Sequence, residues 1–107
     1  MELKLLQDKI EKFVEENNLD SKPEFRFIDL VSEMGELGKE VLKNTNYGKD
    51  SFKNSEELKL ELGDVLYSLI VLSNKLNIDL EEALDSVLKK YQRRLAKGSA
   101  GSEVEEK

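Results

Sequence analysis

Apolar residues recur every three or four positions along most of this chain, with charged residues between them. That spacing is typical of α-helices that bury one face, and alternating strand-like patterns are scarce. Short polar segments divide the pattern into four stretches, and Pro23 lies near the start of the second, where proline is tolerated. The sequence therefore predicts four helices, over residues 2–17, 24–43, about 54–76 and about 79–97.

The last two predicted helices begin at residues that favour a helix start. Asn54 offers an N-cap, with Glu57 three residues later as the second half of a capping box. Asp79 begins the last helix in the same way. We therefore expect an all-α, four-helix bundle-type single domain over residues 1–97. Residues 98–107 are expected to form a flexible tail.

The third predicted helix is apolar around almost its whole circumference. Residues 60–72, LELGDVLYSLIVL, leave only a narrow polar wedge. A helix of that kind is buried on nearly all sides. Three other helices of similar length can hardly cover it, so we expect the domain to assemble as a homodimer or homotetramer.

Two pairs of carboxylates interrupt this apolar pattern at helical spacing. Glu33 and Glu36 lie on one face of the second predicted helix, beside its apolar stripe. Glu61 and Asp64 lie in the polar wedge of the third. If these helices pack antiparallel, four carboxylates converge, and their mutual repulsion requires a cation. Oxygen ligands without imidazole or thiolate suit Mg²⁺ or Mn²⁺, so the sequence predicts a divalent metal site here.

Basic residues offer a second interpretation of the same acids. Lys75, Lys90 or Arg94 could form ion pairs with them, although one such pair would not neutralise four charges. Lys90 and Arg94 are four residues apart near the end of the last predicted helix and border its apolar face. They either complement the dipole at the helix C-terminus or bind phosphate oxygens of a substrate. The sequence leaves both interpretations open.

The composition excludes several function classes. The 107 residues carry a formal net charge of −6, and the pI is about 4.8. Nucleic acid and anionic membranes repel such an acidic chain, so neither is expected as a partner. Histidine and cysteine are absent, which excludes a histidine base, a thiol nucleophile and a zinc thiolate site. The sequence has no signal-peptide pattern and no apolar run long enough to span a bilayer, so we expect a cytoplasmic location.

The segments SEMGELGKEV and ELGDVLYSLIVL together resemble the MazG-like all-α nucleotide pyrophosphohydrolases, whose signature is EExxE, a spacer and ExxD. The resemblance begins at about residue 25 and covers most of the chain. It implies Mg²⁺-dependent hydrolysis of (deoxy)nucleoside triphosphates to the monophosphate and pyrophosphate, in a house-cleaning or pool-controlling role. It also implies dimers or tetramers, and it assigns the metal-binding and catalytic roles to Glu33, Glu36, Glu61 and Asp64.

The chain departs from that signature at Ser32, where the family often has its first glutamate. This departure leaves the general base unassigned, with Glu40 as a candidate substitute. Two alternatives stay open. DVLYSLIVL also resembles phosphoribosyl-ATP pyrophosphohydrolases, although their SYT-type and KxGEE-type segments are absent. A non-catalytic helical dimer that binds a metal or a nucleotide would retain the same acids.

Overall fold

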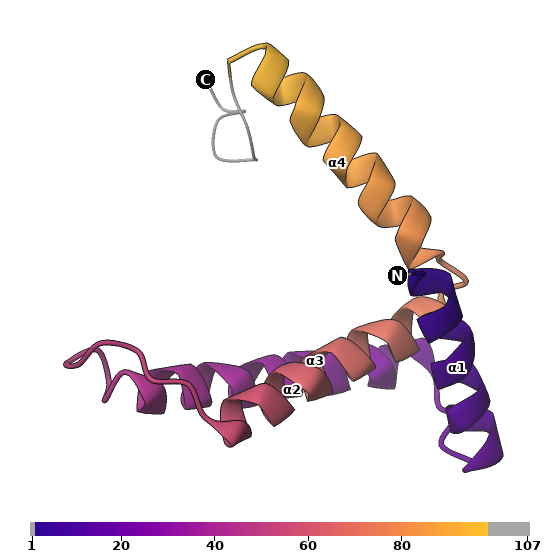
Figure 1. The fold of residues 1–107 in the computed structure, drawn as a ribbon. Coiled ribbons are helices and arrows are strands. Elements are labelled where there is room, and N and C mark those ends of the chain that lie inside the picture. Colours follow the sequence, from indigo (N-terminus) through magenta and orange to yellow (C-terminus); the bar gives the residue numbers. More distant parts are fainter. Residues whose placement is uncertain (1, 99–107) are drawn as a thin grey trace.

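The computed structural model describes residues 2–98, and these residues form four α-helices without a strand (Figure 1). The all-α prediction with four helices is confirmed, and each predicted boundary lies within two residues of the observed one. The predicted tail lies outside the described residues from position 99 onward. The helices are α1 (Leu3–Glu16), α2 (Pro23–Asn44), α3 (Glu56–Lys75) and α4 (Leu80–Ala96).

The start of α3 differs from the prediction by one residue. Ser55, not Asn54, is the N-cap, because Ser55 has the extended backbone of a cap and its Oγ accepts a hydrogen bond from Leu58 N at 3.0 Å. Asn54 Oδ1 instead accepts from Ser55 N at 2.9 Å. The Asn44 side chain donates to the same Ser55 Oγ at 2.9 Å. The cap of α3 is thereby tied to the end of α2.

The start of α4 is capped as predicted. Asp79 Oδ1 accepts hydrogen bonds from Glu81 N at 2.9 Å and Glu82 N at 3.1 Å. The Glu81 carboxylate in turn accepts a hydrogen bond from Leu3 N at 2.9 Å. The first turn of α4 therefore satisfies a backbone donor at the start of α1, and the two helix starts are held together.

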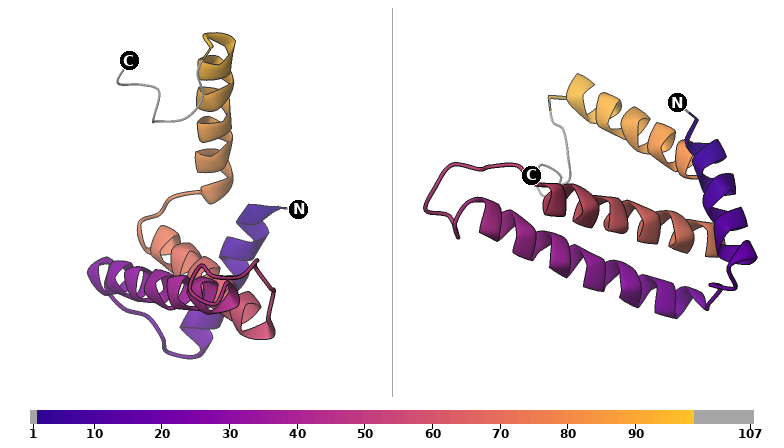
Figure 2. Two further views of the ribbon diagram at one scale, coloured as in Figure 1. Left: turned by 90° about the vertical axis from the view of Figure 1, so that its left-hand side faces the viewer. Right: turned by 60° about the horizontal axis from the view of Figure 1, so that its bottom comes forward.

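The helices form an open arrangement rather than a closed bundle within one chain. α2 and α3 run antiparallel and side by side, and α1 crosses the far end of α3 (Figures 1 and 2). α4 meets α1 at its first turns and then rises away from the α2–α3 pair, which both views in Figure 2 show. None of the helices in residues 2–98 combines the length and apolar character needed to cross a membrane.

A buried glutamine joins the three elements that meet at this corner. Gln7 of α1 is only 2% exposed. Its Nε2 donates to Asn74 Oδ1 at 3.0 Å and to Ile78 O at 2.9 Å. Its Oε1 accepts from Leu80 N at 2.8 Å. All the polar atoms of this buried side chain are therefore satisfied, as buried polar groups require.

The core within one chain is small. Among residues 2–98, the buried apolar side chains are Val14 of α1 and Ile70 and Val71 of α3. Many large apolar side chains on α2, α3 and α4 stay exposed, including Met34 at 56% and Leu88 at 50%. The surplus of apolar surface expected from residues 60–72 is therefore present on the folded chain.

Candidate metal centre

Three of the four predicted acids converge where α2 packs on α3. Glu33 comes from α2, and Glu61 and Asp64 come from successive turns of α3. One carboxylate oxygen from each lies within 4.8 Å of the others. Glu33 and Glu61 are partly buried and Asp64 is exposed. We call these three residues the acid group.

Glu36 lies next to the acid group without joining it. It is exposed on α2, one turn after Glu33, and its negative charge still raises the pKa values of Glu33 and Glu61. Glu40, the candidate substitute base, lies a further turn along α2, and its carboxylate forms an ion pair with Lys43 at 3.8 Å. The structure thus separates the predicted acids into a convergent set of three and an adjacent fourth.

The surroundings of Glu33 and Glu61 disfavour the ionised form of both carboxyl groups. The pKa of Glu33 is raised, first by loss of solvent around its carboxyl and then by the charge of Asp64. The pKa of Glu61 is raised for the same first reason, followed by its hydrogen bond with Asp64 and the charge of that residue. A bound cation would reverse this penalty because it favours the ionised form of each carboxyl.

The ion-pair interpretation fails for Lys75 and finds no support elsewhere. Lys75 Nζ lies 2.9 Å from Asp20, a residue of the segment between α1 and α2. No ion pair between described residues includes a member of the acid group. The charged ends of Lys90 and Arg94 lie 5.3 and 5.9 Å from the ring centre of Tyr91, on α4. Since α4 rises away from the α2–α3 pair, one chain alone does not bring these two residues to the acid group (Figure 1).

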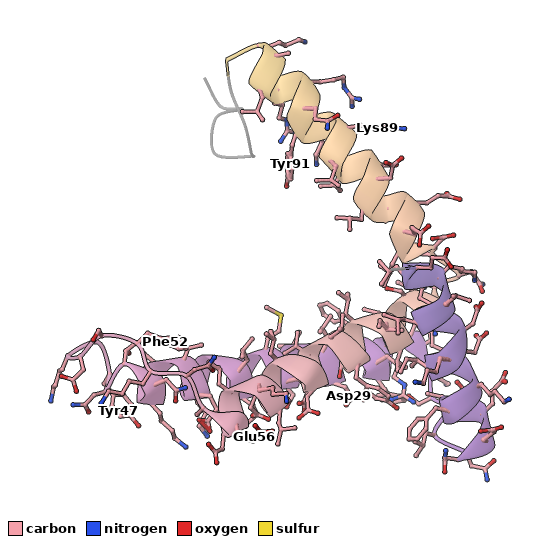
Figure 3. The ribbon with its side chains drawn as sticks, in the orientation of Figure 1. Asp29, Tyr47, Phe52, Glu56, Lys89 and Tyr91 are labelled. Carbon is pink, nitrogen blue, oxygen red and sulfur yellow. The ribbon has the colours of Figure 1, made fainter. Side chains whose placement is uncertain are left out.

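A hollow of about 290 Å³ opens beside the acid group. Its lining is polar and comes from α2 and α3. Asp29 is one of its residues, and Figure 3 shows this side chain on the side of α2 that faces away from α4. The lining residues are Arg26, Asp29, Ser32, Glu33, Asp64, Tyr67 and Ser68.

Arg26 is the basic residue in this lining, and the sequence pattern alone did not single it out. Its side chain is 12% exposed. One guanidinium nitrogen lies 3.7 Å from Asp29, and another donates to the backbone carbonyl of Leu19. Its Nε is buried without a hydrogen-bond partner among the described residues. The sequence does contain one clue to Arg26. It lies seven residues, or two helical turns, before Glu33, and this spacing puts both residues on the same face of α2.

Comparison with known families identifies the chain. The sequence model of the MazG nucleotide pyrophosphohydrolase domain matches residues 25–98. The chain belongs to the MazG nucleotide pyrophosphohydrolase family. The resemblance predicted from about residue 25 is thereby confirmed, and both acid-bearing segments of this MazG-family chain lie within the matched region. The family is one of hydrolases that act on nucleotides.

Individual relatives agree with this assignment. The uncharacterized protein YpjD of Bacillus subtilis is 44% identical over 68 residues. That match covers 61% of this chain and 60% of YpjD, so it spans less than two thirds of the relative.

Three solved structures share the fold. A Bacillus-conserved MazG protein, a nucleotide pyrophosphohydrolase, aligns with a TM-score of 0.71 and 33% identity over 85% of this chain and 89% of its own. The YpjD crystal structure aligns with a TM-score of 0.72 and 34% identity over 88% of this chain and 96% of its own. The protein iMazG from Vibrio DAT 722 aligns with a TM-score of 0.55 and 32% identity over 86% of this chain and 97% of its own.

Proposed function

We propose that this chain hydrolyses (deoxy)nucleoside triphosphates to the monophosphate and pyrophosphate, and that the reaction depends on Mg²⁺, with Mn²⁺ as an alternative. The observation that carries the proposal is the acid group. Glu33, Glu61 and Asp64 offer oxygens within 4.8 Å of one another and have no basic partner among the described residues. Membership of the MazG family supports the nucleotide as the substrate.

The residues present fit a hard divalent cation. The chain has neither histidine nor cysteine, so oxygen atoms are the ligands it can supply. Glu33, Glu61 and Asp64 would hold the ion, and Glu36 is placed to add a fourth carboxylate. When bound, Mg²⁺ neutralises charge on the phosphate oxygens and polarises the phosphoanhydride. An acidic protein can bind a polyphosphate in this way because the ion has opposite charge to both.

The remaining chemistry falls to side chains around the acid group. Cleavage of a phosphoanhydride needs positioning and charge stabilisation rather than a protein nucleophile. Glu36 suits the role of orienting the attacking water or accepting its proton, because it lies beside the acid group and is exposed. Glu40 suits it less well, because its carboxylate is paired with Lys43.

The hollow beside the acid group is proposed to hold the remainder of the nucleotide. At about 290 Å³ it lies near the lower end of small-molecule sites. Tyr67, Ser32 and Ser68 supply hydroxyl groups to its lining, and Arg26 supplies positive charge. We propose that Lys90 and Arg94 add phosphate contacts and that the active form is a homodimer or homotetramer.

The test is ³¹P NMR of the purified protein with a panel of dNTPs and NTPs, each with and without Mg²⁺. We expect monophosphate and pyrophosphate to appear only with the metal, and the fastest nucleotide defines the preferred base and sugar. Release of inorganic phosphate and a nucleoside diphosphate would show that the enzyme cleaves a different phosphoanhydride bond. Absence of turnover across the whole panel would refute hydrolysis of nucleoside triphosphates.

A further inference from the structure

The hollow beside the acid group has two ends of different character. Glu33 and Asp64, two members of the acid group, form one end, and Arg26 lies at the other. Arg26 precedes Glu33 by seven residues of α2, which is about 10 Å along the axis at about 1.5 Å per residue. Because α3 runs antiparallel to α2, Tyr67 and Ser68 lie on the Arg26 side of Asp64. The hollow therefore extends from the acid group toward the start of α2.

Arg26 has an unusual environment for a charged side chain. It is only 12% exposed, and charged residues are rarely buried to that extent unless they are fully paired. One guanidinium nitrogen lies 3.7 Å from Asp29, and another donates to the carbonyl of Leu19. Nε has no hydrogen-bond partner among the described residues. The chain thus holds a guanidinium at the wall of the hollow and leaves part of its donor capacity unused.

The segment between α1 and α2 fixes the position of Arg26. Leu19, whose carbonyl accepts the hydrogen bond from Arg26, donates its own N–H to Val14 O at 2.9 Å, near the end of α1. The next residue, Asp20, forms an ion pair of 2.9 Å with Lys75 of α3. The carbonyl that binds Arg26 is therefore held in place from two helices.

α1 also fixes the aromatic ring of the hollow. Tyr67 lines the hollow from α3, and its ring packs edge-to-face with Phe13 of α1, with 6.3 Å between ring centres and 86° between ring planes. Aromatic pairs favour this geometry. Phe13 and Leu19 both precede residue 25, where the match to the family model begins. The Arg26 end of the hollow is therefore shaped by residues outside the matched region.

We propose that the Arg26 end of the hollow binds the base of the nucleotide, that Arg26 donates hydrogen bonds to acceptor atoms of that base, and that α1 positions Arg26 and Tyr67 for the contact. The proposal rests on the proposed function, because it takes the phosphates to be bound at the acid group. In a nucleoside triphosphate the sugar separates the base from the phosphates. The sugar then lies near Ser32 and Ser68, and the base lies farther along the hollow, at the level of Arg26.

The residues at this end match the chemistry of a base better than that of a phosphate. Every nucleobase presents ring-nitrogen or carbonyl acceptors at its edge, and the planar guanidinium of arginine binds such acceptors. The ring of Tyr67 offers an apolar surface on which a base can stack. Asp29 would repel a phosphate, because its carboxylate lies beside the guanidinium and offsets part of its positive charge.

Binding measurements test Arg26 without turnover. Isothermal titration calorimetry with Mg²⁺ uses two kinds of ligand: α,β-methylene nucleoside triphosphates, which resist hydrolysis, and inorganic tripolyphosphate, which has neither base nor sugar. For Arg26→Gln we expect at least ~5-fold weaker binding of the best nucleotide analogue and unchanged binding of tripolyphosphate, which also shows that the variant is folded. Arg26→Lys keeps the charge without the planar fork and should lose nearly as much.

The matched control is Lys9→Gln, which removes a positive charge from the exposed side of α1 and should bind both ligands like wild type. Three results would overturn the proposal. Equal weakening of tripolyphosphate in a folded variant would assign Arg26 to the phosphates. Equal weakening of the analogues of all four bases would assign it to the sugar, because loss of a base contact changes the ranking among bases. Unchanged binding of every ligand would make Arg26 a structural residue.

The role of α1 is tested at Phe13, which is a positioning residue because it contacts Tyr67 and does not line the hollow. Phe13→Leu removes the ring and keeps an apolar side chain. We expect at least ~3-fold weaker binding of the best analogue and a matching rise in KM, with kcat within about twofold of wild type. Phe13→Tyr keeps the ring and should restore wild-type KM. An equal rise in KM for both variants, or no rise in either, would contradict the role of α1.

The proposed function and this proposal fail in different ways. Base-dependent loss of binding in Arg26→Gln, without hydrolysis of any nucleotide by wild type, would refute only the proposed activity. Hydrolysis by wild type, with KM and base preference unchanged in Arg26→Gln, would refute only the role of Arg26. Absence of binding of every analogue by wild type would overturn both.

Discussion

The corner around Gln7 and the acid group are both polar sites between helices, yet they are built on opposite principles. Gln7 is almost fully buried, and its amide makes hydrogen bonds to Asn74, Ile78 and Leu80. The acid group is less buried, but it holds like charges that no described residue neutralises. The first site is complete within one chain, whereas the second is the one that the proposed function completes with a cation.

This difference predicts which changes damage the fold and which damage the function. A side chain that satisfies its neighbours stabilises the protein, so its loss leaves buried donors and acceptors without partners. A carboxylate held near others by the fold destabilises the metal-free protein, so its loss relieves repulsion. Stability and activity should therefore respond in opposite ways at the two sites.

The largest effect is expected at the acid group. Asp64→Asn removes a proposed metal ligand, and we expect turnover of the best nucleotide to fall by at least ~1000-fold in Mg²⁺. The melting temperature without metal should stay equal or rise, because a like charge has been removed. Turnover is measured by ³¹P NMR and melting by circular dichroism. A variant that loses stability in step with activity would show that Asp64 is a structural residue.

The substitution Gln7→Ala, by contrast, should lower the stability of the protein. It leaves Leu80 N, Ile78 O and Asn74 Oδ1 without their partner, and we expect a loss of about 2–4 kcal/mol in the free energy of unfolding. Urea unfolding at one fixed protein concentration measures this loss. An unchanged midpoint would mean that the corner contributes little to the fold. Glu11→Ala, on the exposed side of α1, is the matched control and should leave the midpoint nearly unchanged.

The pH dependence distinguishes the acid group from ordinary surface carboxylates. The pKa values of Glu33 and Glu61 are raised above 4.5 in the fold. The stability that these two groups contribute without metal is therefore fully present below pH 4.5 and is lost as the pH rises through the raised values. Mg²⁺ requires the ionised carboxylates, so its stabilising effect should grow over the same pH range. Melting temperatures across pH, with and without Mg²⁺, measure both trends, and a Mg²⁺ effect independent of pH would contradict them.

The smallest effect is expected at the cap of α3, another site completed within the chain. Ser55→Ala removes the acceptor for Leu58 N and for the Asn44 side chain. We expect a loss of about 1 kcal/mol in the free energy of unfolding, with turnover nearly unchanged. Asn54→Ala should cost less, because Asn54 does not cap the helix. Chemical denaturation measures the free energy of unfolding of both variants. A larger loss for Asn54→Ala than for Ser55→Ala would indicate that Asn54 is the N-cap of α3.

Helical periodicity predicted most of the fold because each helix shows its own apolar spacing. The bounds of α1 to α4 follow the pattern closely. The cap of α3 was misassigned because Asn54 and Ser55 are both good caps, and the choice depends on the backbone of Ser55 and on Asn44 from another helix. The direction of α4 is likewise set by contacts with α1, which no local pattern records.

The candidate site was predictable only in part. The ExxE and ExxD spacings place acids on one face of each helix, and antiparallel packing then brings Glu33, Glu61 and Asp64 together. Rotation of α2 leaves Glu36 beside this set, which spacing alone does not determine. Arg26 shares a face of α2 with Glu33 by its spacing, but the packing of α2 on α3 is what places it in the lining of the hollow.

The most direct test of this account is a Mn²⁺ titration followed by electron paramagnetic resonance, with wild type, Asp64→Asn and Glu56→Gln. Glu56 is an exposed carboxylate at the start of α3 that pairs with Lys59, so it serves as the matched control. We predict saturable Mn²⁺ binding by wild type and Glu56→Gln, and at least ~10-fold weaker binding by Asp64→Asn. Equal binding by all three proteins would contradict a metal centre at the acid group.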